Sequence, residues 1–161
     1  MQFIVRGISQ ELADEVRRTR RAPGYGHPAH LELASGTGPC RCCLEPFVVG
    51  QEERLLLTYR PPGDAASLMA PGPVFIHARA CRAHAGEGFP DGLRELPLAF
   101  EGRGAAGRVA APMTGAAPPE SQIARLFADD ANEWLHLRHA EAGCFIARIE
   151  RAAVFDLAAT G

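Results

Sequence analysis

The stretch Trp-Leu-His-Leu-Arg-His at residues 134–139, the connection Ala-Glu-Ala-Gly at 140–143, and Cys-Phe-Ile-Ala-Arg-Ile-Glu-Arg at 144–151 decide the fold. Both flanking segments alternate in side-chain character, which is typical of β-strands whose two faces differ. Gly143 can adopt a positive φ where the connection enters the second strand. The stretch therefore predicts an antiparallel hairpin, with Trp134, His136 and Arg138 on one face of its first strand.

The rest of the chain is expected to form further strands and two helices. One helix is capped by Ser9 and the other begins at Pro118 and Pro119. Their apolar faces consist of Leu12, Ala13 and Val16 in the first and of Ile123, Leu126 and Phe127 in the second. Strands are expected at residues 3–8, 30–34, 54–59, 73–78, 96–100 and 108–112. This pattern predicts an α+β fold, with a mostly antiparallel sheet and two main helices, in a single domain over residues 1–161.

The segment Gly-Arg-Gly-Ala-Ala-Gly at residues 102–107 matches the GxGxxG pattern of dinucleotide-binding proteins. That pattern binds a pyrophosphate only where its last glycine lies in a helix. Pro112 and Gly115 leave too few residues for such a helix. We therefore interpret the segment as a hairpin turn.

The composition excludes several classes of function. All 17 Lys+Arg residues are arginine, which excludes Schiff-base catalysis, lysine-bound pyridoxal phosphate and a P-loop. The formal net charge of -2 argues against nucleic acid as a partner. No apolar segment approaches the ~20 residues that span a bilayer, and residues 1–6 are too short for a secretory signal. Five cysteines, an odd number, suit reduced thiols, so we expect a cytoplasmic protein that binds neither nucleic acid nor a membrane.

Several short motifs resemble those of a known family. They are Gly-Pro-Cys-Arg at 38–41, Arg-Leu-Leu-Leu at 54–57, Gly-Pro-Val-Phe-Ile at 72–76, Arg-Leu-Phe-Ala-Asp at 125–129, His-Leu-Arg at 136–138 and Gly-Cys-Phe at 143–145. On these motifs the chain resembles the bacterial family of uncharacterised proteins DUF1203, a resemblance that implies no particular activity. The chain departs from the family pattern at His139, Cys42 and Cys43, which argues against roles for those residues. The resemblance favours a shared site built from Cys40, Arg41, His136, Arg138 and Cys144.

Cysteine and histidine are the main ligands of structural zinc, which needs four of them. The candidates are the segment 40–43, with three cysteines, and the segment His77-x3-Cys81-x2-His84. Cys40-x-Cys42 is tighter than the usual CxxC spacing, and neighbouring Cys42 and Cys43 would point to opposite faces of a strand. The His77 segment has no recognised second segment that would supply the other pair of ligands. The sequence therefore predicts no metal site and no cofactor, and a zinc-stabilised module stays as an alternative.

A second alternative is a thiol-based redox or nucleophilic enzyme. Cys40 follows a glycine-rich loop and lies beside Arg41, a neighbour that favours the thiolate. The candidate catalytic residues are Cys40 as nucleophile and His77 or His136 as base, while Cys42, Cys81 or Cys144 would resolve an oxidised Cys40. Against catalysis, free cysteines are among the most buried residues of proteins, and inert packing explains any one of them.

The leading hypothesis is a pocket for a small anionic molecule. Arg41 and Arg138 would be bidentate forks for a carboxylate or phosphate, with Cys40 and His136 beside them. Alternatively, His136 and Arg138 belong to a solvated outer face of the hairpin. The sequence leaves both an enzyme and a binding protein open.

Two further expectations concern the surface. The acidic clusters Glu52-Glu53, Asp129-Asp130 and Glu141 are interpreted as solvated turn and helix-end residues without a catalytic role. A protein-interaction module is the remaining alternative, including a homodimer in which a second subunit covers a short edge strand.

Overall fold

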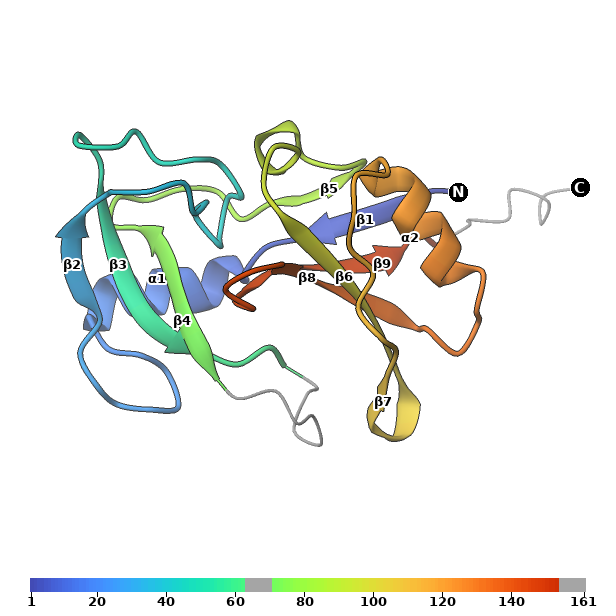
Figure 1. The fold of residues 1–161 in the computed structure, drawn as a ribbon. Helices are drawn as coiled ribbons and strands as arrows, with labels where there is room; N and C mark the ends of the chain where they lie inside the picture. The colour runs from blue at the N-terminus through green and yellow to red at the C-terminus, as the bar shows by residue number, and fades with distance from the viewer. Residues whose placement is uncertain (63–70, 154–161) are drawn as a thin grey trace, which may run out of the picture.

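The computed structural model describes residues 1–62 and 71–153 and has the α+β fold that the sequence predicts (Figure 1). Its two sheets contain only antiparallel strand pairs within these residues. The helices are α1 (Gln10–Thr19) and α2 (Pro119–Phe127), with short 3-10 turns at Asp91–Leu93 and Ala105–Gly107. The strands are β1 (Phe3–Arg6), β2 (His30–Leu33), β3 (Glu53–Tyr59), β4 (Gly72–His77), β5 (Ala85–Glu87), β6 (Leu98–Gly104), β7 (Arg108–Val109), β8 (Trp134–His139) and β9 (Phe145–Arg151).

The larger sheet has six strands in the order β5-β1-β9-β8-β6-β7. The predicted hairpin is at its centre, where β8 pairs with β9 so that Leu135 lies opposite Ile149 and Leu137 opposite Ala147. All four side chains are completely buried. Gly143 has a φ of 73°, which confirms the prediction made for the end of the connection.

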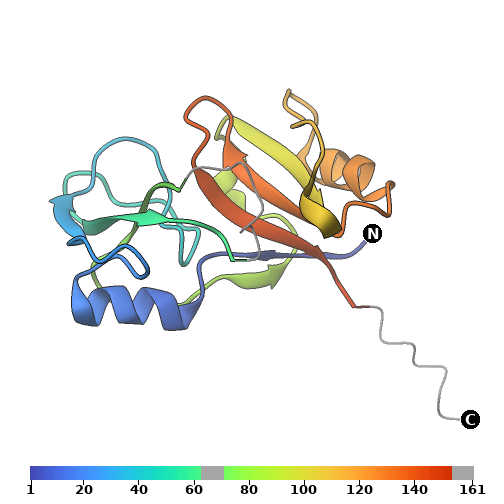
Figure 2. The same cartoon turned by 90° about the horizontal axis from the view of Figure 1, so that it is seen from below.

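The smaller sheet consists of β2, β3 and β4, and α1 lies beside it (Figures 1 and 2). The Ser9 hydroxyl accepts a hydrogen bond from the Leu12 N–H at 3.2 Å, which confirms the predicted cap. A buried core joins α1, through Ala13 and Val16, to the smaller sheet. Cys40 and Cys42 belong to this same core, so the cysteine-rich segment packs against the smaller sheet.

The larger sheet has a core of its own, and α2 packs onto it. The predicted stripe of α2, Ile123, Leu126 and Phe127, is buried in this core together with Phe100 and Leu137. Burial of each such side chain contributes about 1.5–3 kcal/mol, which is ample to hold a helix of this length on the sheet. No helix within residues 1–62 and 71–153 has both the length and the apolar surface needed to cross a membrane.

Strand ends differ from the prediction where backbone partners change. The first strand ends at Arg6 because the N–H groups of Gly7 and Ile8 donate to the carbonyls of His84 and Arg41 instead. β6 extends past residue 100 to Gly104, and Ala105–Gly107 turn the chain directly into the two-residue β7, so the hairpin turn that we interpreted consists of residues 105–107 and residues 102–104 belong to β6. β5 lacks any apolar alternation, and the sequence pattern does not predict it.

Candidate metal centre

The cysteine-rich segment folds into a closed turn rather than a strand. The Leu44 N–H donates to the Cys40 carbonyl at 2.8 Å, and the Cys40 N–H donates to the Glu45 carbonyl at 2.9 Å. Leu44 has a φ of 61°, a left-handed conformation that costs a non-glycine residue roughly 1–2 kcal/mol. Its side chain is buried in the core of the larger sheet, which offsets this cost. The turn brings Cys40 and Cys43 together at CxxC spacing.

The second half of the site comes from β4 and the loop after it. His77 is the last residue of β4, and Cys81 lies in that loop. The turn is hydrogen-bonded to β4, because the Arg41 N–H donates to the Phe75 carbonyl at 2.8 Å and the His77 N–H donates to Cys40 Sγ at 3.3 Å. As a result, Cys40, Cys43, His77 and Cys81 form a group whose ligand atoms all lie within 4.8 Å of one another. We call these residues the Cys/His group.

Two distances in the Cys/His group fit a tetrahedral zinc site. Cys40 Sγ lies 3.9 Å from Cys81 Sγ, and Cys43 Sγ lies 3.5 Å from His77 Nδ1. With Zn–S bonds of about 2.3 Å and Zn–N bonds of about 2.0–2.1 Å, a regular tetrahedron has S···S edges of about 3.8 Å and S···N edges of about 3.6 Å. All the cysteines are free thiols, so the group offers three sulfurs and one imidazole nitrogen.

The carboxylate of Glu52 contacts the edge of the His77 ring that faces away from Cys43. His77 Nε2 lies 3.1 Å from Glu52 Oε2, while Nδ1 faces Cys43. Hydrogen bonds from the Val48 N–H, from Arg79 and from His77 lower the pKa of Glu52 to about 2, so Glu52 is ionised at neutral pH. An ionised carboxylate accepts the Nε2–H and leaves the lone pair of Nδ1 for a metal ion.

Arg17 of α1 contacts the group from another side. Its Nη2 donates to Cys81 Sγ at 2.8 Å, and its Nε donates to the His77 carbonyl at 3.0 Å. Three thiolates and a neutral imidazole around Zn²⁺ carry one net negative charge, and the Arg17 guanidinium, which also pairs with Asp14 at 3.1 Å, lies against the sulfur of Cys81. The first helix thus supplies a positive charge to ligands that come from the turn and from β4.

Hydrogen bonds among the thiols shift the pKa values of Cys42, Cys43 and Cys81. The pKa of Cys81 is lowered because Cys40, Cys42 and Cys43 donate hydrogen bonds to its sulfur and Arg17 lies beside it, although burial acts in the opposite direction. The pKa of Cys42 is raised by its hydrogen bond to Cys81 and by burial, and that of Cys43 by its bonds to Cys40 and Cys81. The surroundings of Cys81 Sγ therefore favour its thiolate form, the form that binds a cation.

The geometry corrects two steps of the spacing argument. Cys40 is joined to Cys43 at the usual CxxC spacing, whereas the sequence argument paired Cys40 with Cys42. The partner half of His77 and Cys81 is this turn. Cys42 lies in the core of the smaller sheet and is not one of the four residues, whereas Cys43 is one of them, although its departure from the family pattern argued against a role for it. The CxxC spacing was the signal that could have found the site, whereas nothing local marks Glu52 or Arg17 as neighbours of it.

The residues of the predicted anion pocket lie around Phe145. Arg41 is buried, and burial lowers its pKa to about 10. Its Nε donates to the Phe145 carbonyl at 2.6 Å and its Nη1 to the Pro39 carbonyl at 2.7 Å. The His136 ring is completely buried and meets the Phe145 ring edge-on, with centroids 5.4 Å apart. Arg138 Nη2 lies 3.4 Å from a carboxylate oxygen of Glu101. An anion site at these residues stays a prediction, and the side chain of Cys40 belongs to the Cys/His group instead.

Only some of the residues predicted for thiol chemistry lie close together. Cys40 and His77 lie in the same group, whereas His136 and Cys144 are not members of it. Cys144 Sγ faces the Ala142 carbonyl at 3.9 Å in the hairpin connection. Cys40 is completely buried, so catalysis by Cys40 on a substrate in solution stays a prediction.

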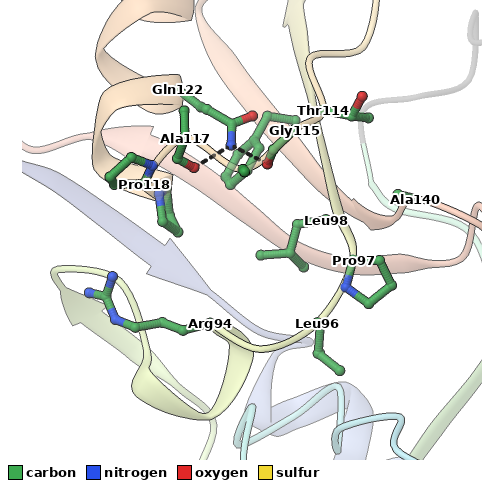
Figure 3. A pocket seen from close by; sticks show the side chains of 13 residues that line it. Arg94, Leu96, Pro97, Leu98, Thr114, Gly115, Ala117, Pro118, Gln122 and Ala140 are labelled. Carbon is green, nitrogen blue, oxygen red and sulfur yellow. Dashed lines mark hydrogen bonds between the residues drawn. The ribbon is translucent and has the colours of Figure 1, made fainter.

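A pocket of about 400 Å³ lies between α2 and the start of β6 (Figure 3). Figure 3 shows Gln122 directing its amide nitrogen to the backbone, where it donates to the Ala117 carbonyl at 2.8 Å and the Gly115 carbonyl at 3.4 Å. Arg94, at the side of the pocket, is paired with Glu120 at 2.5 Å. The described residues that line this pocket include no cysteine, histidine or carboxylate, so the Cys/His group offers the more defined chemistry.

Comparison with known proteins places the chain in a family. The model of the family described as "Protein of unknown function (DUF1203)" matches residues 37–151, a range that includes all four residues of the Cys/His group but not Arg17. No curated protein and no solved structure is significantly similar to the chain. As its motifs predicted, the chain belongs to the DUF1203 family of proteins of unknown function.

Proposed function

We propose that this protein binds one zinc ion through Cys40, Cys43, His77 and Cys81, and that the ion has a structural role. The observation that carries the proposal is the convergence of these four ligand atoms within 4.8 Å of one another. A sulfur-rich tetrahedral donor set with one imidazole is typical of zinc among the common divalent cations. Four protein ligands leave no position for water or substrate, which is the arrangement of structural rather than catalytic zinc.

The position of the site explains what a structural ion would do. The turn is bonded to the smaller sheet through β4. On its other side, the Ile8 N–H donates to the Arg41 carbonyl at 2.7 Å, and the His84 N–H donates to the Cys42 carbonyl at 2.8 Å. Ile8 follows β1 and His84 precedes β5, two strands of the larger sheet. An ion held by the turn, β4 and the loop before β5 therefore ties the two sheets together, and its binding energy adds to the stability of the fold.

Second-sphere contacts support the same proposal. Metal-binding histidines usually donate their other ring N–H to a carboxylate or carbonyl, and Glu52 occupies that position for His77. Arg17 places a positively charged hydrogen-bond donor on Cys81 Sγ, a contact that favours a thiolate ligand. Inert packing of three thiols and one imidazole does not require either contact.

Metal analysis of the native protein tests the proposal. Inductively coupled plasma mass spectrometry of the protein purified by gel filtration should find about one zinc per chain, as a closed four-ligand site requires. Replacement of zinc by Co²⁺ should give the visible bands of tetrahedral cobalt together with thiolate-to-cobalt charge transfer. Cys43→Ser should abolish stoichiometric zinc, whereas Cys144→Ser, which changes a thiol outside the group, should retain it.

Two outcomes would overturn the proposal. One is native protein that takes up neither zinc nor cobalt, and the other is purified protein that carries iron instead. Because Cys43→Ser can also fail to fold, the cobalt spectrum of the unmutated chain decides the question without any variant: absence of the charge-transfer bands excludes thiolate ligation.

A further inference from the structure

The four ligand side chains differ in their access to solvent. Cys40 and His77 are completely buried, whereas Cys43 and Cys81 are half-buried. Both of these thiols border a cavity of about 510 Å³ that is also lined by Arg82 and His84. A small molecule in solution can therefore approach the Cys/His group from the side of Cys43 and Cys81.

Cys81 differs from Cys43 in its contacts. Arg17 Nη2 donates to Cys81 Sγ at 2.8 Å, so a guanidinium lies directly beside this sulfur. Cys43 Sγ faces His77 Nδ1 instead. A guanidinium next to an attacking sulfur can donate a hydrogen bond to an oxygen that leaves with a negative charge. Of the two half-buried sulfurs, Cys81 has the surroundings that suit attack on a peroxide.

A second sulfur lies within reach of Cys81. Cys40 Sγ is 3.9 Å away, and a disulfide needs the two sulfurs at about 2.05 Å, so a closure of roughly 2 Å is required. Cys40 is shielded from solvent, which keeps it from direct oxidation, but it faces the sulfur that solvent reaches. The pair therefore combines an accessible thiol with a buried one that can resolve its oxidised form.

We propose that Cys81 is an oxidation site for hydrogen peroxide and other small peroxides, and that Cys40 resolves it, so that oxidation replaces the zinc site by a Cys40–Cys81 disulfide. This inference rests on the zinc site proposed above. Zinc-bound cysteines are already thiolates. The Cys81 thiolate attacks one peroxide oxygen and the O–O bond breaks. The other oxygen leaves as hydroxide, and Cys81 becomes a sulfenic acid.

The second step completes the electron balance. The Cys40 thiolate attacks the Cys81 sulfur, the S–S bond forms, and a second hydroxide leaves. The two sulfurs together lose two electrons, which the peroxide gains, and two protons from the buffer convert both hydroxides to water. Zinc keeps only Cys43 and His77, too few ligands to hold it, and is released. Thiol reductants reverse the disulfide and restore the site.

The test uses zinc-loaded, full-length protein and hydrogen peroxide. Its zinc content is measured first, and release is then followed with a chromogenic zinc chelator while samples are alkylated and digested with trypsin. Arg41 separates Cys40 from Cys42 and Cys43, and cleavage after Arg79 and Arg82 isolates Cys81 in a tripeptide. Peptide mass therefore distinguishes a Cys40–Cys81 disulfide from a bond of Cys81 to Cys42 or Cys43.

The expected result is release of about one zinc for each Cys40–Cys81 disulfide, with about one peroxide consumed per disulfide. Cys144→Ser, which changes a thiol in the hairpin connection outside the Cys/His group, should release zinc at the same rate as the unmutated protein and form the same disulfide. The inference is overturned by zinc that stays bound, by oxidation of Cys81 only to sulfinic acid, or by a disulfide from Cys81 to the peptide of Cys42 and Cys43.

The zinc measurement before peroxide separates failure of this inference from failure of the zinc proposal. Less than about one zinc per chain at the start contradicts the metal site, because a closed site holds one ion. In that case the peptide map still reports whether peroxide joins Cys40 to Cys81. A full complement of zinc that survives peroxide contradicts only the oxidation site.

Discussion

Glu52 Oε2 lies 3.1 Å from His77 Nε2, on the edge of the imidazole ring opposite to Cys43. Strand register produces this contact: β3 and β4 pair so that Arg54 lies opposite His77, and the Ala78 N–H donates to the Glu53 carbonyl at 3.1 Å. Glu52 therefore lies immediately before the first residue of β3, where its carboxylate reaches the end of β4. A residue that the sequence marks only as part of an acidic turn thus becomes the orienting partner of a candidate metal ligand.

This contact leads to a prediction for zinc affinity. Glu52→Ala should weaken zinc binding 10–100-fold, because His77 loses the acceptor that fixes its Nε2–H tautomer. Glu52→Gln should have a smaller effect, since an amide oxygen still accepts that hydrogen bond and the one from the Val48 N–H. Competition with a chromogenic chelator measures both affinities. Glu53→Ala is the matched control on an exposed neighbour, and an equal loss in Glu53→Ala would contradict an orienting role for Glu52.

A second prediction concerns the charge balance of the site. Arg17 is bonded to Cys81 Sγ and to the His77 carbonyl, so Arg17→Met should weaken zinc binding roughly tenfold, the size expected for a charge-assisted hydrogen bond to a thiolate. Arg18→Met removes the same charge from an exposed position one residue along α1 and should leave affinity unchanged. Isothermal titration of the metal-free proteins with zinc compares the two variants, and similar losses in both would show that only the general field of α1 matters.

Periodicity was sufficient to predict the elements whose stability is local. The hairpin of β8 and β9, the Ser9 cap and the buried stripe of α2 all depend on residues close together in the chain, and all are confirmed. β5 was missed because its partner, β1, lies far away in the sequence and its three residues carry no apolar pattern.

The candidate metal site could be predicted only in part for the same reason. Cys40 and Cys43 stand at CxxC spacing in the sequence, but the adjacent Cys42 allowed the spacing to be interpreted differently. The bond from the Arg41 N–H to the Phe75 carbonyl aligns the turn with β4, and no local pattern encodes it. The contacts of Glu52 and Arg17 likewise depend on strand register and on how α1 packs. Sequence spacing can therefore nominate ligands, while the partners that tune them come from tertiary structure.

A third prediction tests the connection between the larger sheet and the turn. A Cβ added at Gly7 would lie 2.3 Å from the Cys42 carbonyl oxygen and 2.7 Å from that of Arg41. Both are backbone atoms of the turn, so Gly7→Ala must displace it, and we expect a loss of about 1–3 kcal/mol of unfolding free energy together with weaker zinc binding. Gly38→Ala is the control, because its nearest contact would be Arg41 Nη1 at 3.8 Å. Urea unfolding that gives the same stability for both variants would refute this account of the junction.

The last prediction concerns the buried His136 in the larger sheet. Burial, followed by the positive charges of Arg103, Arg138 and Arg148, lowers the pKa of His136 to about 3. In the unfolded chain a histidine has a pKa of about 6.5, so between these values the unfolded state binds the additional proton. His136 should therefore leave stability undiminished above about pH 6.5 and reduce it by up to about 1.4 kcal/mol per pH unit as the pH falls toward 3.

The variant His136→Phe isolates this effect, since it keeps an aromatic ring beside Phe145 but cannot bind a proton. Its absolute stability is not the test, because the substitution also changes packing. The test is the difference in unfolding free energy between the unmutated protein and the variant. Urea unfolding of the metal-free proteins measures it from pH 7.5 to 4, a range that brackets most of the titration of an unfolded-chain histidine at about 6.5. The variant should become more stable relative to the unmutated protein as the pH falls. His30→Phe, at an exposed position of β2, is the control for the loss of a histidine as such. A difference that stays constant with pH would mean that His136 binds its proton equally well in the folded and unfolded states, and that neither burial nor the surrounding arginines lower its pKa.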